Sequence, residues 1–168
     1  GIIDSMVHKN SNAKVTVWHR GFKYTLTNGY TLSVAFGAGN YCDNQNKPLF
    51  EDETWYESSN FEVAVFEPND EIVDLIPAKE EGGWSDQVIG FVPAAALPML
   101  ISALKFWDVR PKFTGEEPDL PGDVAAARRR EVESFEKTLR ARCRIFRNIC
   151  EDYKDRAAKE AKKDVTSV

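Results

Sequence analysis

Alternation of apolar and polar residues dominates the first third of the chain. The apolar positions recur at every second residue in three runs: Val15 and Val17, then Phe22, Tyr24 and Leu26, then Tyr30, Leu32, Val34 and Phe36. Side chains on one face of a β-strand have this period, so the pattern predicts three strands. Asn28-Gly29 is the dipeptide best suited to a two-residue turn with positive φ at both positions. We therefore expect residues 21–27 and 30–36 to pair as a hairpin.

The sheet is expected to continue after a long polar excursion. Residues 43–60 have the composition of a loop, and alternation resumes at residues 61–65. Pro68-Asn69-Asp70 is typical of a turn, and the apolar residues at 72–76 predict a return strand and a second hairpin. Residues 88–92 predict one more strand. The first half of the chain is thus predicted to form an antiparallel sheet of about five to six strands.

Helical spacing replaces alternation in the second half. Apolar residues recur at this spacing in one run: Leu97, Leu100, Ile101, Leu104 and Trp107. Pro98 suits the first turn of a helix and would cost about 3 kcal/mol deeper inside one. We therefore expect a helix over 97–107 that starts regularly at Pro98 and packs on the sheet. Residues 108–122 hold three prolines and several acids and predict a linker.

A long helix is predicted from Asp123, which suits the N-cap, to roughly residue 162. Its large apolar residues fall on one broad stripe. A strict heptad seam would place Arg142 and Arg156 at core positions, so packing on a broad surface is favoured over a two-stranded coiled coil. The helix is expected to bury one face against its own sheet or against a second subunit. This face is formed by Phe135, Leu139, Phe146 and Tyr153.

These patterns predict an α+β fold in three parts. Residues 1–107 form a sheet domain with a packed helix, residues 108–122 a linker, and residues 123–168 a long charged amphipathic helix. Because helix 97–107 should already cover much of one sheet face, we favour a homodimer in which the long helix packs on a partner. Residues 1–5 precede the internal Met6 and are expected to be an expression scar.

The net charge of −5 is divided unevenly along the chain. Residues 1–123 hold 9 Lys and Arg against 19 Asp and Glu, whereas residues 124–168 hold 13 against 8. Such a division fits a basic arm that binds nucleic acid or an acidic partner, and it equally fits a tail that lies on its own acidic body. We favour the second interpretation.

Cysteine content and hydropathy indicate the compartment. Cys42, Cys143 and Cys150 are too few, and odd in number, for a disulfide framework. Cys143 and Cys150 lie on the apolar stripe and are expected to be buried and inert. No run of about 18 apolar residues could span a bilayer. We therefore expect a cytoplasmic protein with no membrane segment.

Candidate metal ligands are few. His8 and His19 are the only histidines, and neither has a spacing that zinc sites use. The acidic runs Glu51-Asp52-Glu53 and Glu80-Glu81 lack the spaced pattern of a calcium loop, so solvated loops are the simpler interpretation. We expect no metal and no cofactor.

Gly37-Ala38-Gly39 resembles a phosphate-binding loop in composition only. A phosphate cradle opens into a helix, whereas residues 40–44 do not have a helical pattern. These glycines are expected to let the end of a strand turn sharply. A small-ligand or nucleotide pocket near residues 37–43 remains an alternative, with Cys42 and His19 as the one conceivable thiol–imidazole pair. An enzymatic activity is not favoured.

Two groups of residues are candidates for binding a partner. The first is Trp55 and Tyr56, aromatic side chains within the acidic excursion. The second is a set of arginines on the long helix: Arg128, Arg129, Arg130, Arg144 and Arg147. Interleaved acids would repel a nucleic-acid backbone and no aromatic stacking motif accompanies them, so a charged helix face is favoured over nucleic-acid binding, which remains the main alternative.

Three segments together resemble a known group of proteins: residues 28–44 (NGYTLSVAFGAGNYCDN), 62–66 (EVAVF) and 86–92 (DQVIGFV). In this pattern the chain is similar to small uncharacterised accessory proteins encoded by bacteriophages, over roughly residues 28–101. The resemblance carries no assigned chemistry. It implies a protein that acts in an infected bacterial cell, and we expect a non-enzymatic protein that binds a host or phage protein, such as an inhibitor of a host or defence factor.

Overall fold

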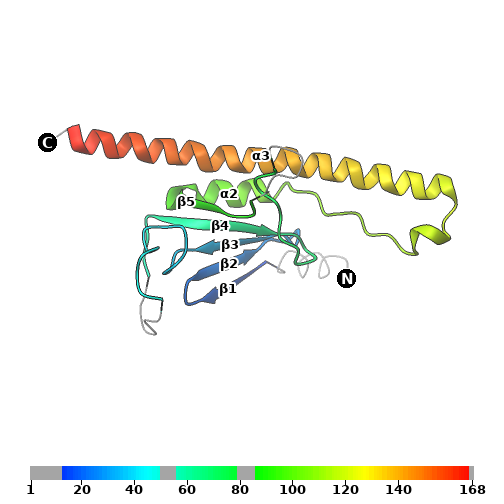
Figure 1. Ribbon diagram of the computed structural model, residues 1–168, viewed down its shortest axis with the longest axis horizontal. Coiled ribbons are helices and arrows are strands. Elements are labelled where there is room, and N and C mark those ends of the chain that lie inside the picture. Colours follow the sequence, from blue (N-terminus) through cyan, green and yellow to red (C-terminus); the bar gives the residue numbers. More distant parts are fainter. Residues whose placement is uncertain (1–12, 50–55, 79–85, 167–168) are drawn as a thin grey trace, which may run out of the picture.

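The computed structural model describes residues 13–49, 56–78 and 86–166. Its centre is a five-stranded antiparallel sheet in which strands adjacent in sequence pair, in the order β1-β2-β3-β4-β5 (Figure 1). The strands are β1 Lys14–Trp18, β2 Gly21–Thr25, β3 Thr31–Ala35, β4 Asn60–Phe66 and β5 Ile89–Pro93. The predicted α+β class and the antiparallel meander are confirmed.

The turn between β2 and β3 differs from the predicted one. The N–H of Leu26 donates to the carbonyl of Tyr30 (2.8 Å), and the N–H of Gly29 donates to the carbonyl of Leu26 (2.9 Å). Gly29 has a φ of +90°, whereas Asn28 is not at positive φ. The loop therefore has three residues and closes with a glycine bulge, which needs one residue at positive φ instead of two.

Gly29→Val is expected to lower the free energy of unfolding by about 1–2 kcal/mol, the cost of left-handed backbone for a residue with a Cβ. A Cβ at this position would also lie 2.9 Å from both Cβ and Cγ of Pro68. Gly122→Val is the control, because a Cβ there meets nothing within 4 Å. Urea denaturation compares the two, and equal midpoints would contradict the assigned turn.

Residues 72–76 do not form the predicted return strand. They make only isolated bridges, Phe66 with Ile72 and Ile76 with Asp86. The physical reason is that β4 already pairs with β3 on one edge and with β5 on the other, so no edge is free for a further strand. The segment passes under a helix instead, with Val73 and Leu75 buried.

The first helix follows β5 directly. A 3-10 turn, η1 (Ala94–Ala96), leads into α2 (Leu97–Leu104), and Pro98 lies in the first turn of α2 as predicted. The helix ends three residues earlier than the expected Trp107. The amide Nδ2 of Asn28 donates to the carbonyl oxygens of Leu104 (2.8 Å), the last residue of α2, and Trp107 (3.3 Å), and so bonds carbonyls at and beyond the end of the helix.

The second helix, α3, runs over Gly122–Thr166 after a short 3-10 turn, η2 (Glu117–Asp119). Asp123 therefore lies in the first turn and is not the N-cap, and the helix extends beyond the predicted end at about 162. The charged residues after Tyr153 continue the helix because they are good helix formers. Within the described residues, no helix is both long and apolar enough to cross a membrane.

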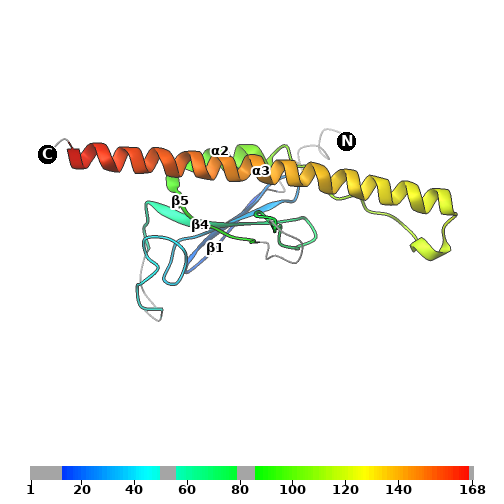
Figure 2. The ribbon, with the colours of Figure 1, turned by 45° about the horizontal axis from the view of Figure 1, so that its top comes forward.

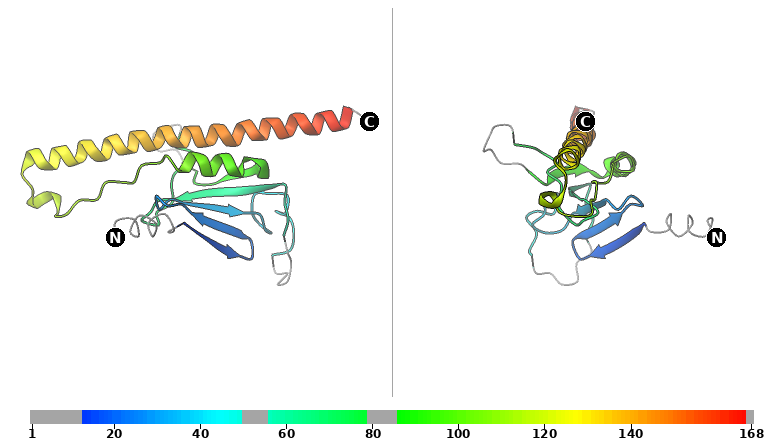
Figure 3. Two further views of the ribbon diagram at one scale, coloured as in Figure 1. Left: turned by 180° about the vertical axis from the view of Figure 1, so that it is seen from behind. Right: turned by 90° about the vertical axis from the view of Figure 1, so that its right-hand side faces the viewer.

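Both helices lie on the same side of the sheet (Figures 2 and 3). The face they cover carries fully buried residues from β3 and β4: Leu32, Val34, Val63 and Val65. Trp107 joins the layers, since its ring meets Tyr30 edge-on (centroids 5.4 Å apart) and Phe146 of α3 in the same manner (6.1 Å). The core thus has one sheet layer and one helix layer.

The predicted packing face of α3 lies on the chain's own body. Phe135 and Phe146 are buried, and Leu139 and Tyr153 are half-buried against the same core. Because α2 and α3 share one sheet face, the argument that α3 lacks a surface within its own chain no longer supports a dimer. The homodimer stays a prediction without that argument. Both ends of α3 extend beyond the sheet, and Ala157 is exposed (Figure 1).

Residues 108–122, predicted as a linker, are anchored where they leave α2. The hydroxyl of Tyr30 donates to the carbonyl of Asp108 (2.7 Å). Burial raises the pKa of Tyr30, so the hydroxyl stays protonated as a donor. The connecting segment therefore contributes contacts of its own to the junction between sheet and α3.

Candidate functional site

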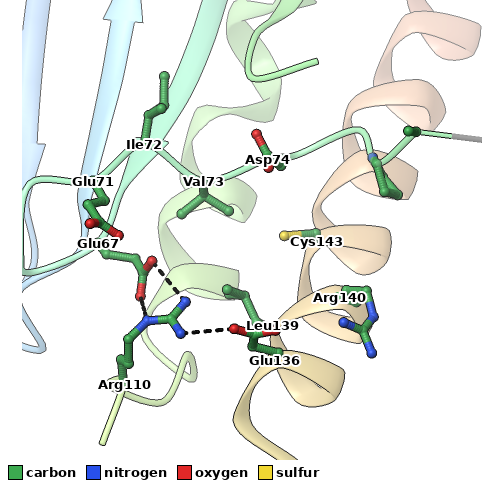
Figure 4. A pocket seen from close by; sticks show the side chains of 12 residues that line it. Glu67, Glu71, Ile72, Val73, Asp74, Arg110, Glu136, Leu139, Arg140 and Cys143 are labelled. Carbon is green, nitrogen blue, oxygen red and sulfur yellow. Dashed lines mark hydrogen bonds and ion pairs between the residues drawn. The ribbon is translucent and has the colours of Figure 1, made fainter. Parts of the chain in front are cut away.

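A cleft of about 400 Å³ lies between α3 and residues 67–78 (Figure 4). Arg110 binds two carboxylates beside it. Its Nε and Nη2 donate to the two oxygens of Glu67 (3.0 and 3.2 Å), and its Nη1 donates to Glu136 (3.2 Å). The bond to Glu67 is the main reason that the pKa of Arg110 is raised. Both carboxylates are engaged with Arg110, so the arrangement joins the residue after β4, the connecting segment and α3.

The thiol that lines this cleft, Cys143, is buried. Burial raises the pKa of Cys143 to about 11 and that of Cys150, about two turns further along α3, to about 12. A cysteine acts as a nucleophile through its thiolate, which such pKa values make scarce at neutral pH. The predicted burial of both thiols is confirmed.

Cys42 and His19 do not form a pair with each other. The Cys42 thiol donates to the carbonyl of Gly37 (3.6 Å), and burial raises its pKa. His19 is exposed and accepts a hydrogen bond from Nε of Arg20 (3.1 Å). Among the described residues there is also no group of three or more His, Cys, Asp or Glu that could hold a metal.

Most backbone amides of the glycine loop are not free to bind a phosphate. Its backbone N–H groups already donate to protein acceptors: Gly37 to Oδ1 of Asn40, Gly39 to the carbonyl of Gln45, Tyr41 to Glu62, and Asp43 to Oδ1 of Asn60. A phosphate cradle requires such donors to point at the ligand. This arrangement disfavours a nucleotide pocket at residues 37–43.

Arg128 and Arg129 hold the start of α3 against its own connecting segment. Arg128 donates to the carbonyls of Thr114 (2.6 Å) and Gly115 (3.1 Å), and its guanidinium lies 4.8 Å from the centre of the Phe113 ring. Arg129 forms an ion pair with Glu117 in η2. These two side chains are used within the chain, which weakens their case as partner-binding residues.

The three other candidate arginines differ in whether they bond to the chain itself. Arg147 donates to the carbonyl of Leu75 (2.6 Å) and fixes the segment that passes under α3. Arg130 and Arg144 are exposed. Three of the five candidate arginines thus bond the chain itself, and nucleic-acid binding loses the cluster on which it was based.

The aromatic candidates of the acidic excursion receive little support. Trp55 lies outside the described residues. Tyr56 is half-buried, with Nζ of Lys47 5.9 Å from the centre of its ring. Neither observation identifies an exposed anchor.

Two exposed aromatic residues come from segments that meet where β5 adjoins the loop after β3. Tyr41 is 53% exposed and Phe91 is 45% exposed; we call these two residues the aromatic patch. The N–H of Phe91 donates to the carbonyl of Tyr41 (2.8 Å), which joins the loop to β5. A Cβ on Gly90 would lie 2.5 Å from Cβ of Tyr41, so this approach requires glycine. The patch was not among the predicted sites.

Phe91 is held in an unusual backbone conformation. Its φ is +54°, a left-handed value that is rare for bulky residues. The cause is a bulge: β4 and β5 are in register at Phe61 and Val92, and again at Val63 and Ile89, so two residues of β5 stand opposite one of β4. The bulge places an exposed aromatic ring on a strained position.

Side-chain hydrogen bonds tie the loop that carries Tyr41 to residues 59–62. Glu62 accepts bonds from Nδ2 of Asn40 (3.2 Å) and from the N–H of Tyr41 (2.8 Å). Asp43 accepts from the Ser59 hydroxyl (2.7 Å) and from Nδ2 of Asn60 (2.9 Å), and these bonds lower the pKa of Asp43. Asp43 is therefore ionised at neutral pH, and the loop is tied to β4.

A signal for this site was present in the sequence. Residues 28–44, 62–66 and 86–92, the three segments singled out in the sequence, supply Tyr41, Asp43, Glu62 and Phe91, and the structure brings these segments together at β4 and β5. The density of Asn and Asp after the glycines was a second signal, because these side chains often bond nearby backbone and order a loop.

Comparisons with known proteins add no relative. No protein-family model, no curated protein and no solved structure matches the chain.

Proposed function

We propose that this chain is a non-enzymatic accessory protein that binds another protein through the aromatic patch. The observation that carries the proposal is Phe91, an exposed aromatic residue at positive φ. Such a conformation costs roughly 1–3 kcal/mol, and glycine would remove the cost. Phe91 is 45% exposed, so the packing of its side chain contributes little to the stability of the fold. A contact with a partner protein gives a reason for an aromatic residue at this position, which the fold itself does not require.

The construction of the patch suits protein binding. Aromatic residues are enriched among the few side chains that carry most of the binding energy at interfaces. A loop that is already ordered before binding also avoids part of the entropy cost of association. Tyr41 has both properties, because its backbone is bonded to Glu62 and to Phe91.

The resemblance to bacteriophage accessory proteins supplies the biological context of the proposal. The segments that carry it also supply the patch, so the proposed activity belongs to the part of the chain that shares this pattern. We propose that the partner is a host or phage protein in the cytoplasm of an infected bacterium, and that binding inhibits a host or defence factor.

The variant Tyr41→Ala/Phe91→Gly is expected to lose the partner without losing the fold. Removing two interface aromatics should weaken binding at least about tenfold. Relief of strain at Phe91 offsets the lost contacts of its ring, so the free energy of unfolding of the single variant Phe91→Gly should stay within about 1 kcal/mol of the wild type. Urea denaturation measures the second effect.

Binding is measured in two steps. Proteins that a tagged wild-type chain captures from host lysate, and the double variant does not, are identified by mass spectrometry, purified and titrated against both. Phe106→Ala is the control, since Phe106 is 70% exposed and lies outside the patch. Equal affinity of the double variant for every captured protein would refute the patch, and a loss of stability well above 1 kcal/mol in Phe91→Gly would make Phe91 a structural residue.

A further inference from the structure

We infer that the open edge of β1 is an interface with a second copy of this chain, in which the two β1 strands pair antiparallel about Thr16. This surface lies at the opposite edge of the sheet from β5 and the aromatic patch, so it adds a second contact to the proposed function. Two features of β1 indicate the pairing: its edge is left open, and its sequence complements itself.

β1 is an edge strand, and Figure 1 shows it on the side of the sheet away from α3. It pairs with β2 over all five of its residues, and no strand among the described residues pairs with its other side. Every second residue of an edge strand turns its backbone N–H and carbonyl groups outward, where they can pair with another strand. β1 contains no proline, and its one charged residue is Lys14. Its outer edge therefore offers a regular set of hydrogen-bonding groups.

The other edge of the sheet is protected in ways that β1 is not. β5 carries the bulge at Phe91, whose N–H already donates to the carbonyl of Tyr41. It ends in Pro93, which has no N–H, and α3 packs against it. Bulges, prolines and covering elements are the usual means by which proteins keep an edge strand from pairing. β1 lacks all three within the described residues.

The apolar face of the sheet continues onto β1. Two rows of side chains cross the helix-covered face, and each ends in a valine of β1: Val15-Tyr24-Leu32-Val65 and Val17-Phe22-Val34-Val63. The members on β3 and β4 are buried and those on β2 are half-buried, whereas Val15 is 60% exposed and Val17 is 76% exposed. A further strand beside β1 would continue these rows and cover both valines.

The sequence of β1 complements itself. In an antiparallel pair centred on Thr16, Val15 lies opposite Val17 of the second copy, and Lys14 lies opposite Trp18. Pairs of β-branched residues across strands are favourable, and the one charge of the strand faces an aromatic ring instead of its own copy. Within the chain, Nζ of Lys23 already lies 5.9 Å from the centre of the Trp18 ring. The rows of valines in the two copies join in this register.

A second copy fits this edge better than a strand of another protein. A two-fold axis closes both open edges at once, and the same five residues supply both sides of the contact. A register centred on Val17 would instead place Lys14 opposite Arg20, which brings like charges together. Because the aromatic patch adjoins β5, the dimer about Thr16 leaves both patches at its outer edges.

Sedimentation equilibrium of the full chain measures the association. We expect a species of twice 19.0 kDa. Val17→Lys should raise the dissociation constant at least about tenfold, since lysine on an edge strand opposes pairing. Val109→Lys is the matched control, because Val109 is also exposed, at 46%, and lies outside the sheet. A wild type that is monomeric at about 100 μM, or equal dissociation constants for the two variants, would overturn the inference.

A disulfide tests the register independently. Thr16→Cys places two cysteines opposite each other, with Cα atoms about 4.5–5.5 Å apart, which a disulfide can bridge. The native thiols of Cys42, Cys143 and Cys150 are buried and do not compete. In Lys14→Cys, the control, the two cysteines would lie four residues apart, roughly 13 Å. Mild oxidation should give a covalent dimer with Thr16→Cys and not with Lys14→Cys.

Equal yields of covalent dimer from the two cysteine variants, or none from Thr16→Cys, would overturn the pairing about Thr16. A chain that stays monomeric and still captures a protein through the aromatic patch would keep the proposed function without this interface. The two proposals therefore fail separately.

Discussion

Phe146→Ala should lower the free energy of unfolding by about 3–5 kcal/mol, the usual cost of truncating a buried phenylalanine. Phe146 is 0% exposed and meets the ring of Trp107, which in turn meets Tyr30 of the sheet. The truncation leaves a cavity where α3, α2 and the sheet join. Because small domains are stable by only about 5–15 kcal/mol, the loss should appear as a large shift of the urea midpoint.

Ile145→Ala is the control for this experiment. Ile145 is the preceding residue of α3 and is 48% exposed, so its truncation should cost less than about 1 kcal/mol. A similar, small loss for both variants would show that α3 is not docked as the structure has it. The same measurement tests the predicted homodimer, because a midpoint that rises with protein concentration would favour it, whereas a midpoint independent of concentration would contradict it.

The pattern of the sequence was enough to predict the layers of the fold. Alternation gave the faces of β2, β3 and β4, and the stripe on α3 gave Phe135 and Phe146 as buried residues. It could not give the surface on which the stripe packs, since an apolar stripe fits its own sheet and a second subunit equally well. Residues 72–76 show the same limit. Their composition suits a strand, but strand formation depends on a free sheet edge, and β4 has none.

The candidate site depends on contacts that periodicity does not describe. Tyr41 and Phe91 are fifty residues apart in the chain, and what joins them is one backbone hydrogen bond and the absence of a side chain at Gly90. The strain at Phe91 arises from a bulge, which is set by the register on both sides of it. Sequence reasoning instead selected the arginines of α3, whose charge pattern was visible but whose partners within the chain were not.

This arrangement also decides which variants are informative. Removing the chain after Phe113 would take away α3, and with it Phe146, Cys143 and Cys150 from the shared core. Such a shortened chain would test folding and not binding. Substitutions at exposed or strained positions, such as Tyr41 and Phe91, leave the core intact. Their effect on binding can therefore be measured apart from any effect on folding.

The second large effect is expected at the ion pair beside the cleft. Arg110→Met should lower the free energy of unfolding by roughly 3 kcal/mol, because it leaves the carboxylate of Glu67, a residue 5% exposed, without its partner. Arg110 is itself partly exposed and its ring contact with Phe135 is partly kept by methionine, which places the value at the lower end for buried pairs. Urea denaturation monitored by circular dichroism measures the loss.

Two further variants distinguish the cost of an unpaired buried charge from the cost of a lost contact. Glu136→Gln removes the exposed acid that Arg110 also binds and should cost less than about 1 kcal/mol, as exposed pairs do. Arg110→Met/Glu67→Met removes both charges, and replacing a buried pair by apolar residues is often nearly neutral. The double variant should therefore be more stable than Arg110→Met alone by about 2 kcal/mol. If the double variant were as unstable as the sum of its single changes, Arg110 and Glu67 would stabilise the fold through separate contacts. They would then not act as a pair that holds the end of β4 to the start of the segment leading to α3.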